Sequence, residues 1–127
     1  MVVEFAKVVP TFRIFSLEKA REFYIGFLGC QVDWEHRFEP DAPVYMQVSR
    51  GNLVLHLSEH HGDATPGSVA LVYMKGIEEL HRELIAKNYR HNRPGLERME
   101  WGMLQVTVID PFGNRIRFSE PIEKSNG

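Results

Sequence analysis

Hydrophobic and polar residues follow two different periods along this chain, and both periods occur in the same order in each half. In the first half, a segment with strand-like alternation at 6–14 precedes Leu17–Leu28, where apolar residues recur at helical spacing. Alternation at every second residue is typical of a strand, and recurrence every three or four residues is typical of an amphipathic helix. Ser16 is placed to cap this helix, and Gly29 is placed to end it. Three further strands are expected at 31–36, 44–49 and 52–58.

The second half repeats this order of elements. A strand pattern at 68–74 precedes a helix pattern at 76–87. Three more strands are expected at 96–99, 104–109 and 115–119. Asp110–Asn114 combines Asp-Pro with Gly-Asn, which predicts a tight turn before the last strand. The fourth strand of each half ends in Ser-Glu, at Glu59 and Glu120, so the sequence indicates one supersecondary unit used twice.

Length and composition are those of one ordinary globular domain. The chain has 127 residues, of which 43% are hydrophobic, and we expect module one at about 5–59, a linker at about 60–67 and module two at about 68–120. The net charge of −2 argues against nucleic acid or a membrane surface as a partner. Cys30 is the single cysteine and the first residues do not form a secretory signal, so we expect a cytoplasmic protein.

Several motifs together resemble those of a known superfamily. The matching stretches are Phe12–Tyr24 followed by Leu28-Gly29, then Gly51-Asn52, then Trp101-Gly102-Met103, and finally Asp110–Phe118. The pattern resembles the glyoxalase/bleomycin-resistance/dioxygenase superfamily, also called vicinal oxygen chelate proteins. It is most similar to the bleomycin-resistance branch, because Trp101-Gly102 stands shortly before the DPFGN motif. The resemblance implies an α+β fold in which two βαβββ modules form an open cup-shaped barrel, completed in a homodimer, with ligands bound inside the cup.

The resemblance also allows the question of a metal to be asked residue by residue. Catalytic members of the superfamily hold a divalent metal with side chains from the first and last strands of each module. Strand alternation places His56 and Arg117 on the cup face at equivalent positions, and the other two ligand positions fall near Val9 and Ser68. A fixed guanidinium repels a cation, and valine has no lone pair. We therefore expect neither a metal nor another cofactor.

Seven residues form the candidate ligand-binding set: Trp101, His56, Arg117, Trp34, Phe38, Ser58 and Arg13. Alternation also directs Val54, Ala70 and Arg115 into the cup. Trp34 and Phe38 stand where the bleomycin-resistance branch uses aromatic rings to sandwich planar groups of the drug. His56 and Arg117 are expected to form a polar pair, in which the positive charge of Arg117 keeps His56 neutral.

Three hypotheses about function follow. The first is a metal-independent small-molecule binding protein of the bleomycin-resistance type, which sequesters an antibiotic or related ligand in a dimer cleft. The second is a metal-dependent glyoxalase-like lyase or isomerase, or a dioxygenase, with a non-standard ligand set that includes His56. The third is a metal-free enzyme in which His56 acts as general base beside Arg117. Missing metal ligands favour the first hypothesis and no catalytic residue is expected, but arginines in the cup would suit an anionic ligand better than a cationic drug.

Overall fold

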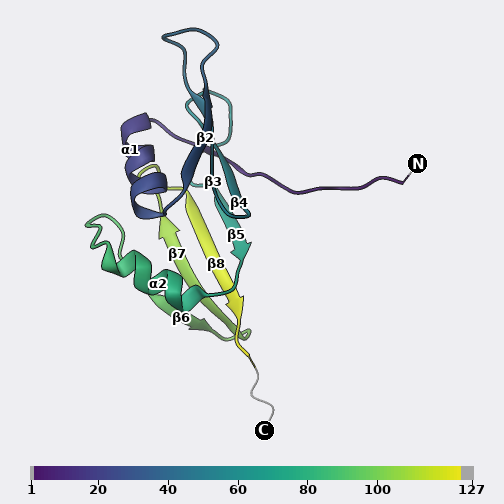
Figure 1. The fold of residues 1–127 in the computed structure, drawn as a ribbon, viewed down its shortest axis with the longest axis vertical. Helices are drawn as coiled ribbons and strands as arrows, with labels where there is room; N and C mark the ends of the chain where they lie inside the picture. The colour runs from purple at the N-terminus through teal and green to yellow at the C-terminus, as the bar shows by residue number, and fades with distance from the viewer. Residues whose placement is uncertain (1, 124–127) are drawn as a thin grey trace.

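A computed structural model describes residues 2–123 and shows two modules of the same design (Figure 1). Module one consists of β1 (Thr11–Arg13), α1 (Leu17–Arg21), η1 (Glu22–Phe27), β2 (Gln31–His36), β3 (Tyr45–Arg50) and β4 (Leu53–Ser58). Module two consists of β5 (Val69–Tyr73), α2 (Ile77–Ala86), β6 (Leu96–Met99), β7 (Met103–Ile109) and β8 (Arg115–Pro121). The predicted order of two βαβββ units is confirmed.

Each module forms its own four-stranded sheet. The order is β1-β4-β3-β2 in the first sheet (sheet A) and β5-β8-β7-β6 in the second (sheet B). In both sheets the first strand runs parallel to the last, and the remaining neighbours are antiparallel. The strands form two open sheets rather than one closed barrel, so each sheet keeps two edges.

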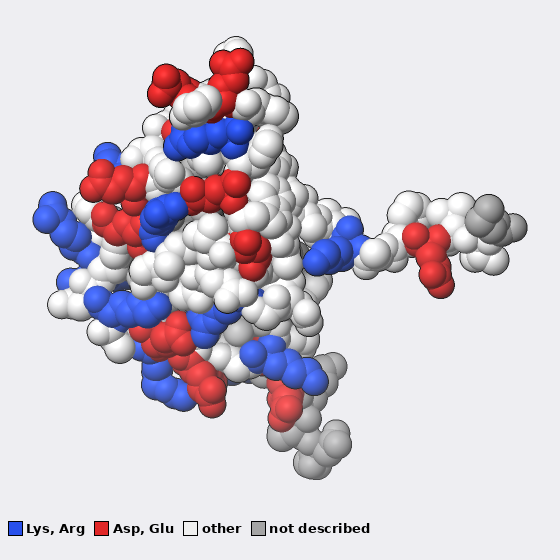
Figure 2. Space-filling model, turned by 45° about the horizontal axis from the view of Figure 1, so that its top comes forward, with Lys and Arg blue, Asp and Glu red and all other residues white. Residues whose placement is uncertain are grey.

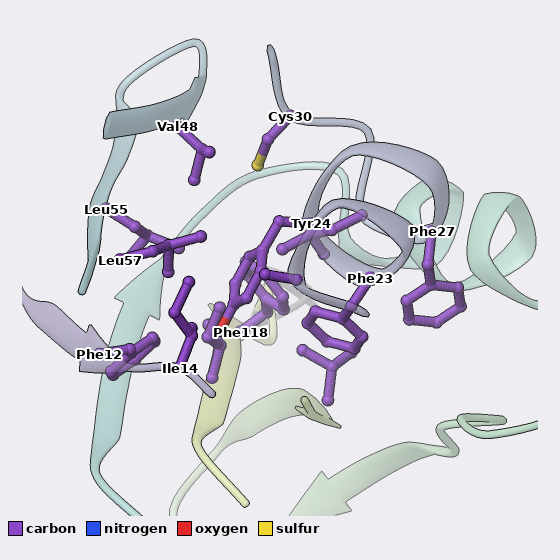
Figure 3. Packing of buried hydrophobic residues seen from close by; sticks show 14 of the residues in the cluster. Phe12, Ile14, Phe23, Tyr24, Phe27, Cys30, Val48, Leu55, Leu57 and Phe118 are labelled. Carbon is purple, nitrogen blue, oxygen red and sulfur yellow. The ribbon is translucent and has the colours of Figure 1, made fainter. Parts of the chain in front are cut away.

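A shared hydrophobic core joins the two modules. Both helical segments lie on the same side of the molecule, and the apolar faces of the two sheets pack against them (Figure 1). Phe12 and Leu57 of sheet A belong to the same buried cluster as Tyr24 of η1 and Phe118 of sheet B (Figure 3). Because side chains alternate along a strand, this arrangement leaves the opposite face of each sheet uncovered by helices. We call these the open faces of sheets A and B.

The first helix has the predicted limits but not a single geometry. The Ser16 hydroxyl accepts a hydrogen bond from the Lys19 backbone N–H at 3.2 Å, as expected of an N-cap. Gly29 follows the helix with a φ of 80°, a left-handed conformation that favours glycine. The second half, η1, is a π-helix that buries Phe23 and Tyr24. The spacing of apolar residues does not distinguish this wider helix from an α-helix.

A buried carboxylate connects η1 to the turn between β7 and β8. Asp110 accepts hydrogen bonds from the Tyr24 hydroxyl at 2.6 Å, from the Phe112 backbone N–H at 2.8 Å, and from both the backbone and the side-chain nitrogen of Asn114 at 2.8 and 2.9 Å. The Asn114 side chain also donates to the Arg13 carbonyl at 2.9 Å. Burial, with the nearby Asp110 charge, raises the pKa of Tyr24 well above its usual value. The predicted turn is therefore also a contact between the modules.

Two sequence-based predictions about strands were wrong. The strand expected at 6–14 is confined to β1, because its pairing with β4 begins where Thr11 lies beside His56. The Pro10 carbonyl still accepts a hydrogen bond from the His56 N–H at 3.0 Å, but the preceding residues extend away from the body (Figure 1). Ala70 was expected on the open face, yet it lies beside the buried Ile116 and packs against the core. Since β5 is apolar on both faces, its sequence does not reveal which face is covered.

Two features of the described residues bear on possible partners, the character of the helices and the charges on the face shown in Figure 2. None of the helices within residues 2–123 has the length and apolar character needed to cross a membrane. In the view of Figure 2, acidic and basic side chains are interspersed over the side that carries the helices. The surface near the N-terminal segment contains few charges in this view.

Candidate functional site

Three rings are grouped on the open face of sheet A. Trp34 on β2 stacks on Tyr45 of β3, with ring centroids 5.9 Å apart and an angle of 14° between the planes. The ring of His56 on β4 meets both of them edge-on, at 5.3 Å from Trp34 and 5.2 Å from Tyr45. These strands are adjacent in the sheet, so alternation alone brings the three side chains to one face.

A hollow of about 620 Å³ lies beside these rings. Its lining consists of Trp34, His36, Phe38, Tyr45, His60, His61 and Asp63. Phe38 follows β2 and is 74% exposed, and its ring lies 4.5 Å from His36 and 5.8 Å from His60. Aromatic walls with a few polar groups at the rim are typical of a site for a planar organic ligand. Of the predicted set, the structure thus brings together Trp34, Phe38 and His56.

A chain of hydrogen bonds crosses the open face of sheet A and fixes the state of His56. The Gln47 side-chain nitrogen donates to the Asp33 carboxylate at 3.0 Å, so the Gln47 oxygen faces His56 Nε2, also at 3.0 Å. An ionised carboxylate only accepts hydrogen bonds, which sets the orientation of the amide. His56 Nε2 therefore carries the hydrogen, and His56 Nδ1 accepts from the Tyr45 hydroxyl at 2.7 Å. Both ring nitrogens of His56 are occupied within sheet A.

The charge states of this chain of residues have local causes. The hydrogen bond from Gln47 lowers the pKa of Asp33 below its usual value. Burial lowers the pKa of His56, because a charged imidazolium is less well solvated there. The expectation that Arg117 keeps His56 neutral was therefore wrong.

Arg117 and His56 occupy equivalent slots in different sheets. His56 lies between Thr11 of β1 and Gln47 of β3, whereas Arg117 lies between Leu71 of β5 and Thr107 of β7. The internal repeat is thus correctly aligned, but the expected polar pair does not form within one chain. Arg117 is exposed on the open face of sheet B.

Val9 and Ser68, which were predicted to occupy the two remaining ligand positions, are not the residues that lie beside His56 and Arg117 in the sheets. Val9 precedes β1, and Ser68 precedes β5. The residues that flank His56 and Arg117 on those strands are Thr11 and Leu71.

Ser58 and Arg13 hold the loop that forms one wall of the hollow. The fully buried Ser58 hydroxyl donates to the Asp63 carboxylate at 2.8 Å and accepts from the His60 N–H at 3.0 Å. The Arg13 guanidinium donates to the His60 carbonyl at 2.7 Å and lies 4.7 Å above the ring of Phe15. Both side chains therefore position the loop, and neither lines the hollow.

Trp101 lies on the other sheet. It occupies the tight turn between β6 and β7, where Gly102 has a φ of 81°, and its side chain is 66% exposed. It borders a separate hollow of about 630 Å³ together with Arg98, Met99, Glu100, Gly102, Met103, Pro121 and Ile122. Within one chain, the structure does not bring Trp101 to the rings of sheet A.

A further hollow of about 450 Å³ lies between the modules and contains none of the predicted site residues. It is bordered by the β3–β4 turn and the start of α2. Arg50 and Glu83 form a bidentate ion pair at this boundary, at 2.7 and 2.8 Å. These contacts tie the modules together. Because this hollow contains none of the predicted site residues, we take the aromatic hollow of sheet A as the candidate site.

Sequence reasoning missed several residues of the site. Tyr45 and Gln47 alternate along β3 with the buried Met46, so the pattern that placed His56 on the open face also applies to them. His60 and Asp63 come from the segment read as a linker, whose composition gives no sign that it forms a wall.

Because the folded protein keeps His56 neutral, the free energy of unfolding should depend on pH. Because the folded pKa lies below the usual 6.5, the unfolded chain binds a proton more readily than the folded protein. The contribution of His56 to stability is fully present above about pH 6.5 and decreases as the pH falls toward the folded pKa. We expect NMR titration to place the His56 pKa below 6.5, and His56→Gln to lose less thermal stability on acidification than the wild type. A His56 pKa at or above 6.5 would contradict this prediction.

Comparisons with solved structures agree with the fold. A bleomycin-binding protein complexed with bleomycin superposes with a TM-score of 0.72 at 18% identity, covering 91% of this chain and 98% of that one. TnmS3, an antibiotic binding protein from Streptomyces sp. CB03234, gives 0.72 at 21% identity, covering 94% and 99%. The bleomycin-binding protein of Streptomyces verticillus, complexed with copper(II)-bleomycin, gives 0.68 at 22% identity, covering 97% and 100%. At these identities the likeness establishes the shared fold.

Sequence comparison supplies the family. No curated protein matches the chain. The family profile described as "Glyoxalase superfamily protein" matches residues 1–125, which is nearly the whole sequence. Together with the two βαβββ modules, this match shows that the chain belongs to the glyoxalase superfamily.

Proposed function

We propose that this protein is a metal-independent binding protein that sequesters a planar aromatic antibiotic or related small molecule. The observation that carries the proposal is the hollow beside the stacked rings of Trp34 and Tyr45, with the exposed ring of Phe38 at its rim. Rigid aromatic side chains offer large contact areas at low conformational cost. Similar folds that bind bleomycin and another antibiotic lend support to this ligand class.

Within one chain, the charge near the hollow favours a cationic ligand over an anionic one. Arg13 is turned toward the His60 carbonyl and the Phe15 ring, and Arg117 lies on sheet B. Asp33, in contrast, stands next to Trp34 in sequence and is linked through Gln47 to the face that carries the rings. A carboxylate with a lowered pKa remains ionised at neutral pH and attracts cations. Of the arginines that argued against a cationic drug, Arg13 is therefore engaged elsewhere, whereas Arg117 bears on the charge of the ligand only through sheet B of a second copy.

The proposed binding cleft is shared between two copies of the chain. Trp101 and Arg117 belong to sheet B, while the aromatic hollow belongs to sheet A. In a twofold-symmetric dimer, the open face of sheet A of one copy can stand opposite the open face of sheet B of the other. This arrangement would bring the partner's sheet B over the hollow and would enclose a ligand that a single sheet leaves exposed.

The residues around His56 support metal independence. Both nitrogens of His56 are engaged by Tyr45 and Gln47, and the flanking side chain on β1 is Thr11. The equivalent slot of sheet B contains Arg117, whose fixed positive charge opposes a cation. Among residues 2–123, no three His, Cys, Asp or Glu side chains are grouped to hold a metal ion. This donor set does not fit the divalent metal of the catalytic superfamily members.

Calorimetric titration with bleomycin tests the proposal. We expect saturable binding of metal-free bleomycin and of its copper(II) complex, unchanged by prior treatment of the protein with EDTA. Elemental analysis after purification without chelators is expected to show well under one equivalent of zinc, nickel, manganese or iron. No binding of bleomycin or of other planar cationic antibiotics would refute the function. A tightly held metal equivalent that is lost in His56→Ala would refute metal independence and favour the metal-dependent enzyme.

A further inference from the structure

Two arginines lie next to each other on the open face of sheet B. Arg115 and Arg117 are separated by one residue on β8, so strand alternation directs both side chains to the same face, and both are exposed. Among residues 2–123, the salt bridges are those of Arg21, Arg50 and Lys87, and neither Arg115 nor Arg117 takes part in one. Two guanidinium groups at this spacing favour an anion between them.

Apolar side chains surround the two arginines. On β5, Val69 lies beside Arg115 and Leu71 lies beside Arg117, and these two neighbours are 49% and 52% exposed. On β7, Ile109 lies on the other side of Arg115 and is 44% exposed. A group of exposed apolar side chains marks a site for a ligand or a partner. A molecule that fits this face therefore has an acidic group attached to an apolar body.

The polar groups beside Arg117 are compatible with an anion. Thr107 of β7 is the lateral neighbour of Arg117, and its hydroxyl accepts a hydrogen bond from the Gln105 amide at 3.4 Å. The hydroxyl hydrogen of Thr107 can therefore donate to an acidic group. Glu97 of β6 also belongs to this face, but it lies beside Gln105, so β7 separates it from the arginines.

Module one serves as an internal control, because the repeat defines the equivalent positions on sheet A. Thr11, which lies beside His56, corresponds to Leu71, and the uncharged Val54 corresponds to Arg115. Sheet A is thus polar where sheet B is apolar, and uncharged where sheet B is positive. Both patterns are compatible with the βαβββ fold, so the character of sheet B is not a requirement of the fold and indicates a role in binding.

We infer that Arg115 and Arg117 form a subsite for the carboxylate of a zwitterionic planar ligand. A guanidinium can donate two parallel hydrogen bonds to a carboxylate, and apolar neighbours strengthen this contact because they exclude water from it. In the proposed cleft, this subsite of one copy lies opposite the aromatic hollow of the other. The hollow lies near Asp33, which attracts the cationic end of a ligand. A ligand that spans the cleft is therefore positive at the end near sheet A and negative at the end near sheet B.

This inference rests on the proposed function, because only a cleft shared by two copies brings both ends of the ligand into contact. It narrows the ligand class to planar molecules with an amine at one end and a carboxylate at the other. Ciprofloxacin has this chemistry, and its methyl ester keeps the planar ring system and the amine but loses the negative charge. The two compounds therefore form a matched pair of probes.

Calorimetric titration with this pair, at the same pH and salt concentration, tests the subsite. We expect the wild type to bind ciprofloxacin about 10- to 100-fold more tightly than the ester, the range for hydrogen bonds to a charged group. Arg117→Met and Arg115→Met should each weaken the binding of ciprofloxacin and leave that of the ester unchanged. Arg82→Met replaces an exposed arginine of α2 and is the matched control, which should bind both probes like the wild type. Light scattering checks that each variant keeps the wild-type mass.

The outcomes separate this inference from the proposed function. Equal binding of ciprofloxacin and its ester by the wild type would overturn the inference and leave the proposed function intact. A preference for the acid that survives in both arginine variants, or no binding of either probe, would also overturn it. If the preference depends on the arginines but Trp34→Ala binds both probes normally, the carboxylate subsite stands and the aromatic hollow does not. Arginine variants that lose the wild-type mass together with the affinity would assign Arg115 and Arg117 to the contact between copies and overturn the inference.

Discussion

Replacing Trp34 with alanine should weaken the binding of bleomycin by about 10- to 100-fold, which corresponds to about 1.4–2.7 kcal/mol. Trp34 stacks on Tyr45 and lines the hollow, so its removal takes away one flat wall of the proposed site. The side chain is 41% exposed, so we expect the protein to stay folded. Isothermal titration calorimetry on the purified variant measures the loss directly.

Two comparisons make this experiment decisive. Ile85→Ala alters an exposed apolar residue on α2, away from either open face, and should bind like the wild type. Trp101→Ala tests the shared cleft, because Trp101 lies in a different hollow of the same chain. A loss in both tryptophan variants would support a cleft built from two copies, whereas a loss in Trp34→Ala alone would place the ligand on one sheet A. Wild-type affinity in Trp34→Ala would show that the hollow is not the ligand site.

Replacing Asp110 with alanine should lower the free energy of unfolding by about 2–4 kcal/mol. The Asp110 carboxylate is buried and accepts from Tyr24, Phe112 and Asn114. Its removal leaves these donors without a partner inside the protein, and such groups are costly to bury. Urea denaturation followed by circular dichroism gives the change from the shift in midpoint.

Two further substitutions test whether the loss of stability in Asp110→Ala comes from the hydrogen bonds to its carboxylate. Tyr24→Phe removes a single hydrogen bond to the carboxylate and should cost about 1–2 kcal/mol. Asp41→Ala changes an exposed carboxylate and should leave the midpoint unchanged. If Asp110→Ala unfolds at the wild-type midpoint, the network around the β7–β8 turn does not hold the modules together.

Most of the fold could be predicted from the sequence, because the patterns that indicate its strands, helices and turns involve residues close together in the chain. The alternation in 31–36 and 52–58, the helix after Ser16, and the turn at Asp110–Asn114 all have the predicted limits to within a residue or two. These features depend on neighbouring residues in the chain, and a repeated motif doubles the evidence for each. The length of β1 did not follow, because it depends on how far β4 extends beside it.

The candidate site followed only in part, because its geometry depends on contacts between distant segments. Alternation placed His56 on the open face, but it did not reveal that Tyr45 and Gln47 occupy its two nitrogens. Ser58 and Arg13 have the polar character of site residues, yet both side chains form hydrogen bonds with the loop at 59–63 and do not face the hollow. The pairing of His56 with Arg117 failed within one chain because equivalent slots of a repeat lie on separate sheets.

Because the two tryptophans lie on different sheets, intrinsic tryptophan fluorescence can report on ligand binding. Trp34 and Trp101 are the two tryptophans of the chain, and they lie on different sheets in surroundings of different polarity. Trp34 is stacked on a phenol ring, while Trp101 is mostly exposed in a turn. Indole emission shifts to longer wavelength as the ring is more exposed to water, so we expect Trp101 to emit at a longer wavelength than Trp34. A Trp101→Phe variant would therefore emit from the aromatic hollow alone, and its spectrum would follow occupancy of that hollow without any added label.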